Sequence, residues 1–455
     1  MKKHTQSPYE SSKVSYKPSG IEWLGEIPQS WEIRRLKHLT ILFTGESIKD
    51  ADKDKYSIVE NAIPYIATKD IGLDSNDVNY NNGMFIQNDD TGFKRAYKNS
   101  TLLCLEGANA GKKIAFLNQE VCFVNKLCCI SNKSKELDSK ALFYFFQGSF
   151  FKNTFFSNIS GLIGGVTTTQ LGNFKIPLPP LQEQKEIAEF LDKKCEKIQN
   201  YINKKQKLIT LLQEKKQALI NEAVCGRVAC HTERSEVSTT AYKPSGIEYL
   251  GLIPHHWEAV KVKFTAYVKG RIGFHGLNSN EFRYDEGAYL VTGNDFDNNE
   301  VMWDKCRRVS EERFYEDPNI HLQNNDLLIT KDGTIGKTAI VNNCPKQATL
   351  NSGIFLVRTL KEICFVKYLF FIINSQYFKE FVNVKTSGST IKHLYQSDFH
   401  DLKIPLPPLQ EQKQIANFLD EKCEKINSVI EKTKKQIELV KEYKNTLINE
   451  AVCGR

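Results

Sequence analysis

The chain has 455 residues, 40% of them hydrophobic and 25% charged, a composition typical of a globular protein with enough length for two or three domains. No apolar run approaches the roughly 20 residues of a membrane helix, and the amino terminus carries no apolar signal segment, so we expect a cytoplasmic protein without membrane contact. The net charge of +8 is compatible with nucleic acid as a partner but is too small to identify one.

Three stretches of the sequence occur twice. The repeated blocks are residues 16–22 (YKPSGIE) with 242–248, residues 175–185 (KIPLPPLQEQK) with 403–413, and residues 219–227 (LINEAVCGR) with 447–455. The offset is 226 for the first block (242 − 16) and 228 for the others (403 − 175, 447 − 219), so the chain is a tandem duplication. Residues 16–37 and 242–263 are identical at 14 of 22 positions, whereas the middles, 38–174 and 264–402, share little. Constant ends with divergent middles suggest a common scaffold that holds two segments, each of which recognises something different.

The repeats divide the chain into segments. We predict an α+β fold with an internal pseudo-two-fold duplication, in which two domains of divergent sequence are separated by two long antiparallel coiled-coil helices. The predicted segments are an N-terminal tail (1–15), a first domain (16–180), a first long helix (181–227), a linker (228–241), a second domain (242–408) and a second long helix (409–455).

The first middle indicates a compact α+β domain. Strands are predicted at 102–105, 114–117, 121–124 and 127–130, followed by an aromatic-rich buried helix over 142–156. The second middle follows the same plan, with strands at 327–330, 338–341 and 354–358 and a helix over 366–381. In this alignment the turn that ends at Gly111-Lys112 matches the turn that ends at Gly336-Lys337.

Three kinds of loop in these middles carry side chains suited to DNA. They are polar groups that end an apolar strand, glycine turns with a basic tip, and glycine-rich loops with hydroxyl groups, all able to bond phosphates or base edges. An ordinary surface loop is an equal alternative for each single residue. The candidate DNA-binding residues are Thr68, Lys69, Asp70, Lys112, Lys113, Thr167, Thr168, Thr169, Gln170, Thr292, Asn294, Asp295, Lys331, Lys337, Ser389, Thr390, Lys392 and His393.

Motifs for catalysis or metal binding are missing from the sequence. Gly336-Lys337-Thr338 resembles the end of a phosphate loop, but the required glycine five residues earlier is Lys331, so a tight turn is the better interpretation. We find no methyltransferase Asn/Asp-Pro-Pro-Tyr/Phe motif, Walker pair, helicase box or nuclease cluster, and so expect no catalytic residue. The twelve cysteines contain no Cys-x-x-Cys pair, and we favour core packing over zinc binding for them.

The last part of each repeat predicts one long helix. Pro179-Pro180 precedes the first, Glu183 lies near its positive end, and Gly226 follows it. Apolar residues recur at alternating spacings of three and four, which indicates a coiled-coil seam or a partner-docking face. The seam residues are Ile187, Leu191, Ile198, Ile202, Ile209 and Leu212, with Ile415, Leu419, Ile426, Ile430, Ile437 and Val440 in the second copy.

A helix this long is not stable alone in water, so its seam needs a partner. We favour antiparallel pairing of the two copies, which would put the divergent middles at opposite ends and bring Arg455 close to the Tyr16 region. The alternatives are parallel pairing and two independent helices that each pack on their own domain.

The repeated blocks resemble the specificity subunit of type I restriction-modification systems. The resemblance covers nearly the whole chain, from Tyr16 to Arg455, and departs from the family at the 228–241 linker. It rests on YKPSGIE followed by Ile27-Pro28 and Trp31-Glu32, on their copies Ile253-Pro254 and Trp257-Glu258, on the two IPLPPLQEQ blocks and on the helix after each.

The resemblance implies a non-catalytic, DNA-reading subunit that recognises a bipartite target on double-stranded DNA. It implies two methyltransferase (M) subunits as partners and, for restriction, two restriction/translocase (R) subunits. No cofactor is expected in this chain, while S-adenosylmethionine, ATP and Mg²⁺ are expected in those partner subunits. A coiled-coil scaffold without sequence-specific DNA binding and a self-sufficient nuclease stay open as alternative hypotheses.

Overall fold

The computed structural model describes most of the chain. The described residues are 15–57, 60–161, 164–227, 241–247, 250–271, 277, 279–386 and 392–455. They form two compact units, of which unit 1 combines residues 1–206 with 433–455 and unit 2 consists of residues 207–432. Each unit therefore contains one α+β domain and parts of both long helices. The predicted linker lies outside the described residues except for Ala241.

Both predicted long helices are confirmed. Helix α5 (Leu181–Val224) and helix α10 (Leu409–Val452) have 44 residues each, or about 66 Å at about 1.5 Å per residue. Each ends at a glycine with a left-handed backbone, Gly226 with φ 69° and Gly454 with φ 72°, as expected for a helix C-terminus.

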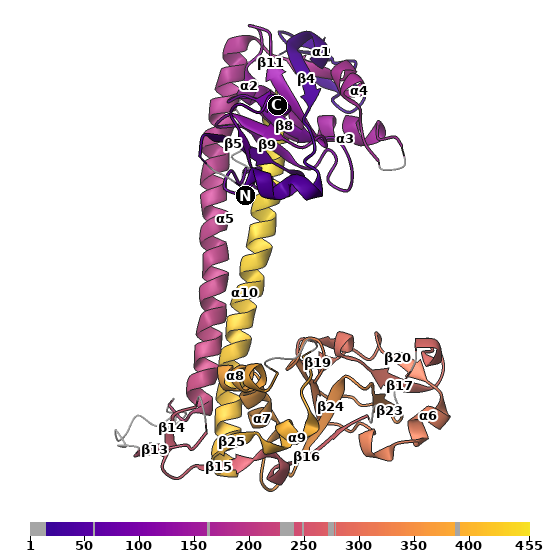
Figure 1. Cartoon of the computed structure of the whole chain (residues 1–455), viewed down its shortest axis with the longest axis vertical. Coiled ribbons are helices and arrows are strands. Elements are labelled where there is room, and N and C mark those ends of the chain that lie inside the picture. Colours follow the sequence, from indigo (N-terminus) through magenta and orange to yellow (C-terminus); the bar gives the residue numbers. More distant parts are fainter. Residues whose placement is uncertain are drawn as a thin grey trace. The chain divides into compact units, whose positions relative to one another are not determined.

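The two helices are antiparallel within each unit (Figure 1). In unit 1 the start of α5, at Ile187 and Leu191, shares a hydrophobic core with the end of α10, at Leu447 and Ala451. In unit 2 the end of α5 shares a core with the start of α10, and Lys216 Nζ donates to Asn427 Oδ1 over 3.0 Å. The antiparallel prediction is confirmed, and all twelve predicted seam residues are buried or half-buried.

Unit 1 contains a β-rich domain that precedes α5 in the sequence. Its strands are β1 (Tyr16–Pro18), β2 (Glu26–Pro28), β3 (Glu32–Arg35), β4 (Thr40–Thr44), β5 (Ala62–Ile66), β6 (Phe85–Gln87), β7 (Arg95–Ala96), β8 (Thr101–Cys104), β9 (Ile114–Phe116), β10 (Val121–Phe123), β11 (Leu127–Asn132) and β12 (Lys175–Leu178). Its short helices are α1 (Leu36–Leu39), α2 (Ser139–Gln147), α3 (Ser149–Ser157) and α4 (Thr168–Asn173). Among the described residues the larger sheets have the orders β4-β11-β8-β9 and β6-β5-β10-β7.

Unit 2 contains the second domain. Its strands are β13 (Tyr242–Pro244), β14 (Leu252–Pro254), β15 (Glu258–Lys261), β16 (Ala266–Gly270), β17 (Ala288–Val291), β18 (Phe296–Asp297), β19 (Glu300–Val301), β20 (Arg307–Val309), β21 (Leu327–Thr330), β22 (Thr338–Ile340), β23 (Ala348–Leu350), β24 (Ile354–Thr359) and β25 (Lys403–Leu406). Its short helices are α6 (Glu311–Tyr315), α7 (Val366–Ile373), α8 (Gln376–Lys385) and α9 (Gln396–Asp401). Within its described part the larger sheets have the orders β16-β24-β21-β22-β19-β18 and β20-β17-β23.

The predicted aromatic helix is two helices in each domain. The segment over 142–156 breaks at Gly148 between α2 and α3, and the segment over 366–381 breaks at Asn374 and Ser375 between α7 and α8. In unit 1 the Asn449 side chain of α10 accepts the Ser149 N–H at the start of α3 over 2.6 Å. In unit 2 Asn221 of α5 accepts the Gln376 N–H at the start of α8 over 2.8 Å. The long helices thus cap the second short helix, an interaction that local periodicity does not reveal.

A buried glutamine ties each long helix to its own domain. Gln184 is fully buried, and its amide donates to the carbonyls of Glu136 (2.8 Å) and Pro179 (2.8 Å) and accepts the Asp138 N–H (2.8 Å). Gln412 repeats this pattern with Ile363 (2.9 Å), Pro407 (2.9 Å) and the Phe365 N–H (2.8 Å). The second glutamine of each QEQ block therefore stabilises the fold, because the buried backbone groups need a hydrogen-bond partner.

The end of each long helix is held by the amino-terminal block of the other repeat. In unit 1 the Tyr16 hydroxyl donates to the Gly454 carbonyl over 2.8 Å, and an added Cβ on Gly454 would lie 2.6 Å from Pro28. In unit 2 the Tyr242 hydroxyl donates to the Gly226 carbonyl over 3.0 Å, where an added Cβ would lie 2.4 Å from Pro254. The predicted proximity of Arg455 to the Tyr16 region is confirmed.

The Gln184→Ala substitution tests the tie between helix and domain. It leaves two carbonyls and one N–H without their partner in a buried site, at about 1–3 kcal/mol for each unsatisfied group. We expect the free energy of unfolding to fall by at least about 3 kcal/mol, measured by denaturant titration of far-ultraviolet circular dichroism. Gln182→Ala is the matched control, because Gln182 is exposed on the same helix turn and its side chain bonds the exposed Glu186 over 2.9 Å. An equal loss of unfolding free energy in the two variants would contradict a stabilising contribution from the Gln184 hydrogen bonds.

Candidate nucleic-acid interface

Two predicted loops meet in the domain of unit 1. The 3₁₀ turn Thr68–Asp70 follows strand β5, and the Lys113 Nζ donates to the Thr68 carbonyl over 2.7 Å. The Asp70 side chain is buried and accepts the Ala67 N–H (2.9 Å) and the Asn82 amide (2.7 Å). Asp70 therefore stabilises the turn from within.

The same arrangement occurs in unit 2. The 3₁₀ turn Gly293–Asp295 follows strand β17, and the Lys337 Nζ donates to the Gly293 carbonyl over 2.8 Å. The buried Asp295 carboxylate accepts the Thr292 N–H over 2.7 Å and the Thr292 hydroxyl over 2.9 Å. Thr292 and Asp295 are thus used by their own turn.

Strand register corrects the alignment of the two basic turns. The Cys104 N–H donates to the Lys113 carbonyl (3.0 Å), and the Thr330 N–H donates to the Lys337 carbonyl (2.9 Å). Lys337 therefore corresponds to Lys113, whereas the sequence pattern paired it with Lys112. Lys112 is an additional exposed residue whose Nζ bonds the Ala108 carbonyl over 3.1 Å. The predicted strands begin at Ile114 and at Thr338. Alignment of these two strand starts could have shown from the sequence that Lys113 corresponds to Lys337.

The third loop of unit 1 also reaches the basic turn. The Gly107 N–H donates to the Gly164 carbonyl over 3.0 Å, which places the start of α4 beside that turn. Thr167 and Gln170 cap α4 reciprocally, since the Gln170 Oε1 accepts the Thr167 N–H (2.8 Å) and the Thr167 Oγ1 accepts the Gln170 N–H (3.2 Å). Thr169 is exposed and Thr168 half-buried on the first turn of α4.

The corresponding loop of unit 2 pairs with the turn after β21. The His393 ring bonds the Asp332 carboxylate, and the Leu394 N–H donates to the Lys331 carbonyl over 2.9 Å. Lys392 is exposed beside them, while Ser389 and Thr390 lie outside the described residues. Lys331 is half-buried over the Phe355 ring at 5.2 Å, and burial lowers the pKa of its amine, with Asp332 acting in the opposite direction.

Each unit therefore gathers its candidate residues from three separate loops. In unit 1 the 3₁₀ turn, the basic turn and the start of α4 are joined by hydrogen bonds, with Lys69 and Lys112 exposed. In unit 2 Asn294, Lys337 and Lys392 are exposed in the same three loops. Amine and amide groups on such loops can bond phosphate oxygens or the edges of bases.

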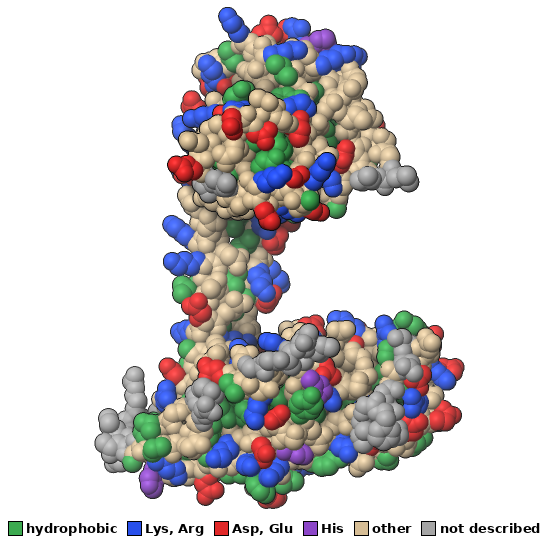
Figure 2. Space-filling model, viewed as in Figure 1, with side chains coloured by type: hydrophobic (Ala, Val, Ile, Leu, Met, Phe, Trp, Pro, Cys, Tyr) green, Lys and Arg blue, Asp and Glu red, His purple; other side chains and the backbone are tan. Residues whose placement is uncertain are grey.

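Charged side chains of both signs lie on the face of the molecule drawn in Figure 2. On the face shown in Figure 2, basic and acidic side chains are interspersed over each unit. A phosphate-binding surface with a single sign of charge would show a continuous basic patch. On that face no continuous patch of one charge sign covers the described residues of either unit.

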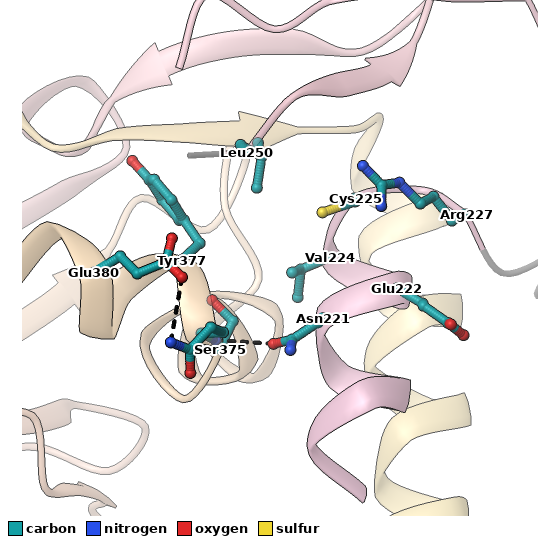
Figure 3. Close-up of a pocket in the computed structure, with 10 residues that line it drawn as sticks. Asn221, Glu222, Val224, Cys225, Arg227, Leu250, Ser375, Tyr377 and Glu380 are labelled. Carbon is teal, nitrogen blue, oxygen red and sulfur yellow. Dashed lines mark hydrogen bonds between the residues drawn. The ribbon is translucent and has the colours of Figure 1, made fainter. Parts of the chain in front are cut away.

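The cavity drawn in Figure 3 belongs to the scaffold of unit 2. It has a volume of about 210 Å³ and lies where the end of α5 meets α8, between Asn221, Cys225, Gln376 and Glu380. Asn221 points to the backbone at the start of α8, and the Gln376 amide bonds Glu380 over 3.2 Å (Figure 3). Asn221 is thus used for capping α8, and no candidate DNA-binding residue lines the cavity.

Several cysteine thiols in the described part of the chain are buried in the domains. Burial raises the pKa of the thiols of Cys122, Cys128, Cys306 and Cys364 to about 12, so they stay protonated at neutral pH. Among the described residues, no three His, Cys, Asp or Glu side chains are grouped so that they could hold a metal ion. A search of those same residues finds no helix that could span a membrane.

The helix cysteines belong to the hydrophobic cores. Cys225 and Cys423 are buried in the core of unit 2, and the half-buried Cys195 and Cys453 pack against the core of unit 1. The predicted core-packing purpose of these four side chains is confirmed.

Fold and site together define a class of protein: a duplicated α+β chain whose two domains present polar loops and share a pair of antiparallel helices. The family model described as type I restriction modification DNA specificity domain matches residues 28–213 and 276–439. These two segments cover more than half of the chain. The chain therefore belongs to the family of type I restriction-modification DNA specificity subunits.

Curated relatives cover nearly the same length. The chain is 26% identical over 447 residues to the type I restriction enzyme MjaVIII specificity subunit of Methanocaldococcus jannaschii, covering 94% of this chain and 93% of the relative. It is 22% identical over 358 residues to the EcoBI specificity subunit of Escherichia coli, covering 78% of this chain and 71% of the relative.

Solved structures share the fold. A chain from work on complex assembly and conformational transition of the type I R-M system matches with a TM-score of 0.68 and 16% identity, over 94% of this chain and 98% of that chain. The HsdS subunit from Thermoanaerobacter tengcongensis matches with a TM-score of 0.51 and 16% identity, over the same shares of the two chains. At these identities the likeness concerns the fold.

The Gly111→Ala substitution tests the packing beneath the basic turn. Gly111 has φ 68°, and an added Cβ would lie 2.6 Å from the Cδ1 of the fully buried Phe155. Gly107→Ala is the control, because Gly107 has φ 81° and no atom within 4 Å of an added Cβ. Both variants cost about 1–2 kcal/mol of left-handed backbone strain, and Gly111→Ala adds about 1–3 kcal/mol of overpacking. Chemical denaturation that gives equal losses for both would contradict this packing.

Proposed function

We propose that this chain reads a bipartite DNA target, one half-site with each domain, as part of a type I restriction-modification complex. One observation carries the proposal: the two domains hold equivalent 3₁₀ turns with the same aspartate and lysine bonds, yet expose different side chains. Lys69 and Lys112 project in the first domain, and Asn294 and Lys392 in the second. Two unlike readers on one framework suit a target whose halves differ in sequence.

We further propose that the complex contains two methyltransferase subunits and, for restriction, two restriction/translocase subunits. S-adenosylmethionine, ATP and Mg²⁺ would be bound by those partners, and this chain would supply DNA specificity without catalysis. Such a complex acts on chromosomal DNA, so a cytoplasmic location is part of the proposal.

Repeated apolar residues on the long helices support two equivalent docking sites. Leu211 of α5 is 50% exposed and Leu439 of α10 is 64% exposed, and the repeat relates them (439 − 211 = 228). Tyr201 and Val429 form a second related pair (429 − 201 = 228), at 41% and 44% exposure. Exposed apolar side chains that recur at equivalent positions suit two copies of the same partner.

Replacing residues 38–174 with the same segment of another specificity subunit tests the division of labour. We expect the methylated motif of cells that carry the complex to change in one half only, because residues 264–402 stay intact. Methylome sequencing measures this outcome. A motif altered in both halves would contradict modular reading, and a complex that binds cognate and random duplex equally would favour the scaffold hypothesis.

The docking surface is tested with the double variant Leu211→Asp and Leu439→Asp. Full burial of a leucine contributes about 1.5–3 kcal/mol, so we expect at least about tenfold weaker binding of the methyltransferase at each site. Co-purification and titration of the methyltransferase measure the loss. The control, Lys204→Asp with Lys432→Asp, changes two exposed helix residues related by the same repeat and adds more negative charge. Similar weakening in the control would contradict an apolar docking surface.

A further inference from the structure

The middle residue of the 3₁₀ turn differs between the two units. Lys69 occupies this position in unit 1 and Asn294 in unit 2, and both are exposed. Within the described part of the chain, neither side chain makes a hydrogen bond or an ion pair. Each side chain is therefore available to a ligand without breaking a bond of the fold.

The surrounding framework is the same in both units. Asp70 and Asp295 each accept the N–H three residues earlier, over 2.9 Å and 2.7 Å. Their own carbonyls accept the N–H of Asn79 over 2.8 Å and of Met302 over 2.9 Å.

An equivalent lysine donates a hydrogen bond to the carbonyl of the first residue in each turn. Lys113 bonds the carbonyl of Thr68 over 2.7 Å, and Lys337 bonds the carbonyl of Gly293 over 2.8 Å. With this bond, each turn is held at its first and last residues while its middle side chain projects. Positions 69 and 294 are therefore structurally equivalent, with different chemistry on one frame.

An equivalent frame with different middle side chains distinguishes a residue that reads bases from one that contacts phosphates. The phosphate backbone is the same for every DNA sequence, so a positioning residue can keep the same charge in both domains. A base-reading residue must differ between domains that read different bases. A cation at one position and a neutral amide at its equivalent fit the second case.

We propose that Lys69 and Asn294 are the equivalent specificity-determining residues of the two domains, reading base edges in the major groove. This inference rests on the proposed function. Lysine pairs with the O6 and N7 acceptors of guanine, whereas the asparagine amide pairs with N6 and N7 of adenine. Lys69 thus selects a G·C pair in its half-site, and Asn294 selects an A·T pair in the other. Lys113 and Lys337 act as positioning residues that hold the turns.

The reciprocal variants Asn294→Lys and Lys69→Asn test this assignment in the full complex with its methyltransferase. Sequencing of methylated DNA then reports the preference at every position of both half-sites. For Asn294→Lys we expect one base pair of the half-site read by unit 2 to shift from A·T towards G·C, by about 5-fold to 150-fold in relative preference. The half-site read by unit 1 stays unchanged. Lys69→Asn gives the opposite shift in that other half-site.

A truncation keeps the test independent of new contacts. Asn294→Ala removes the amide without adding bulk, and we expect discrimination at the same single base pair to be lost. Its thermal unfolding midpoint and its co-purification with the methyltransferase should match the unsubstituted chain, because Asn294 holds nothing in the fold. The control Lys135→Asn changes an exposed lysine between β11 and α2 and should leave the motif unchanged.

Two results would overturn the assignment while the proposed function stands. One is an unchanged split motif in every variant, and the other is an equal loss of affinity for all sequences, which is the behaviour of a phosphate contact. If the unsubstituted complex itself methylates no split motif, the proposed function fails, and the assignment falls with it.

Discussion

Each long helix depends on contacts with both repeats. A helix of 44 residues with a polar outer face has little stability alone, so packing at its two ends must supply it. Its start is joined to its own domain by Gln184 or Gln412, and its end lies against the tyrosine and proline of the other repeat's amino-terminal block. Unit 1 is thus completed by residues 433–455 from the other end of the sequence, whereas unit 2 is the continuous segment 207–432.

This constraint explains which parts of the duplication are identical. The QEQ blocks supply the buried amides, the YKPSGIE blocks supply the tyrosine that bonds the helix end, and the LINEAVCGR blocks supply that end. Glu183 and Glu411 of the same blocks accept the indole N–H of Trp31 and Trp257, over 2.9 Å and 3.1 Å. A change in one partner would leave a buried group unpaired, so these segments vary less easily than exposed loops.

The domains use a rigid frame to present variable side chains. Buried aspartates and one lysine hold each 3₁₀ turn, and the turn is linked by hydrogen bonds to the strand pair β8-β9 or β21-β22. Substitution at the exposed middle residue therefore changes chemistry without altering the frame. Under the proposed assignment, a specificity subunit acquires a new recognition preference by this route at little cost in stability.

Much of the fold was accessible from the sequence because it is written in local patterns. Proline and glycine bounds with a seam of alternating spacing predicted α5 and α10 correctly, and apolar runs predicted strands β8 to β11 within about two residues. The aromatic segments were predicted as single helices and are pairs, because Asn449 and Asn221 cap the second member from the opposite long helix. Such long-range caps leave no trace in periodicity.

The sequence by itself determined the duplication, the helical seam and the family resemblance, since these depend on repeated letters and spacing. The tertiary structure showed through its strand pairing that Lys113 corresponds to Lys337, although the predicted strand starts at Ile114 and Thr338 already pointed to this register. It also separated Asp70 and Asp295, which are buried inside the turns, from Lys69 and Asn294, which project from them. Neighbouring polar residues look alike in a sequence, and burial distinguishes them only after the chain has folded.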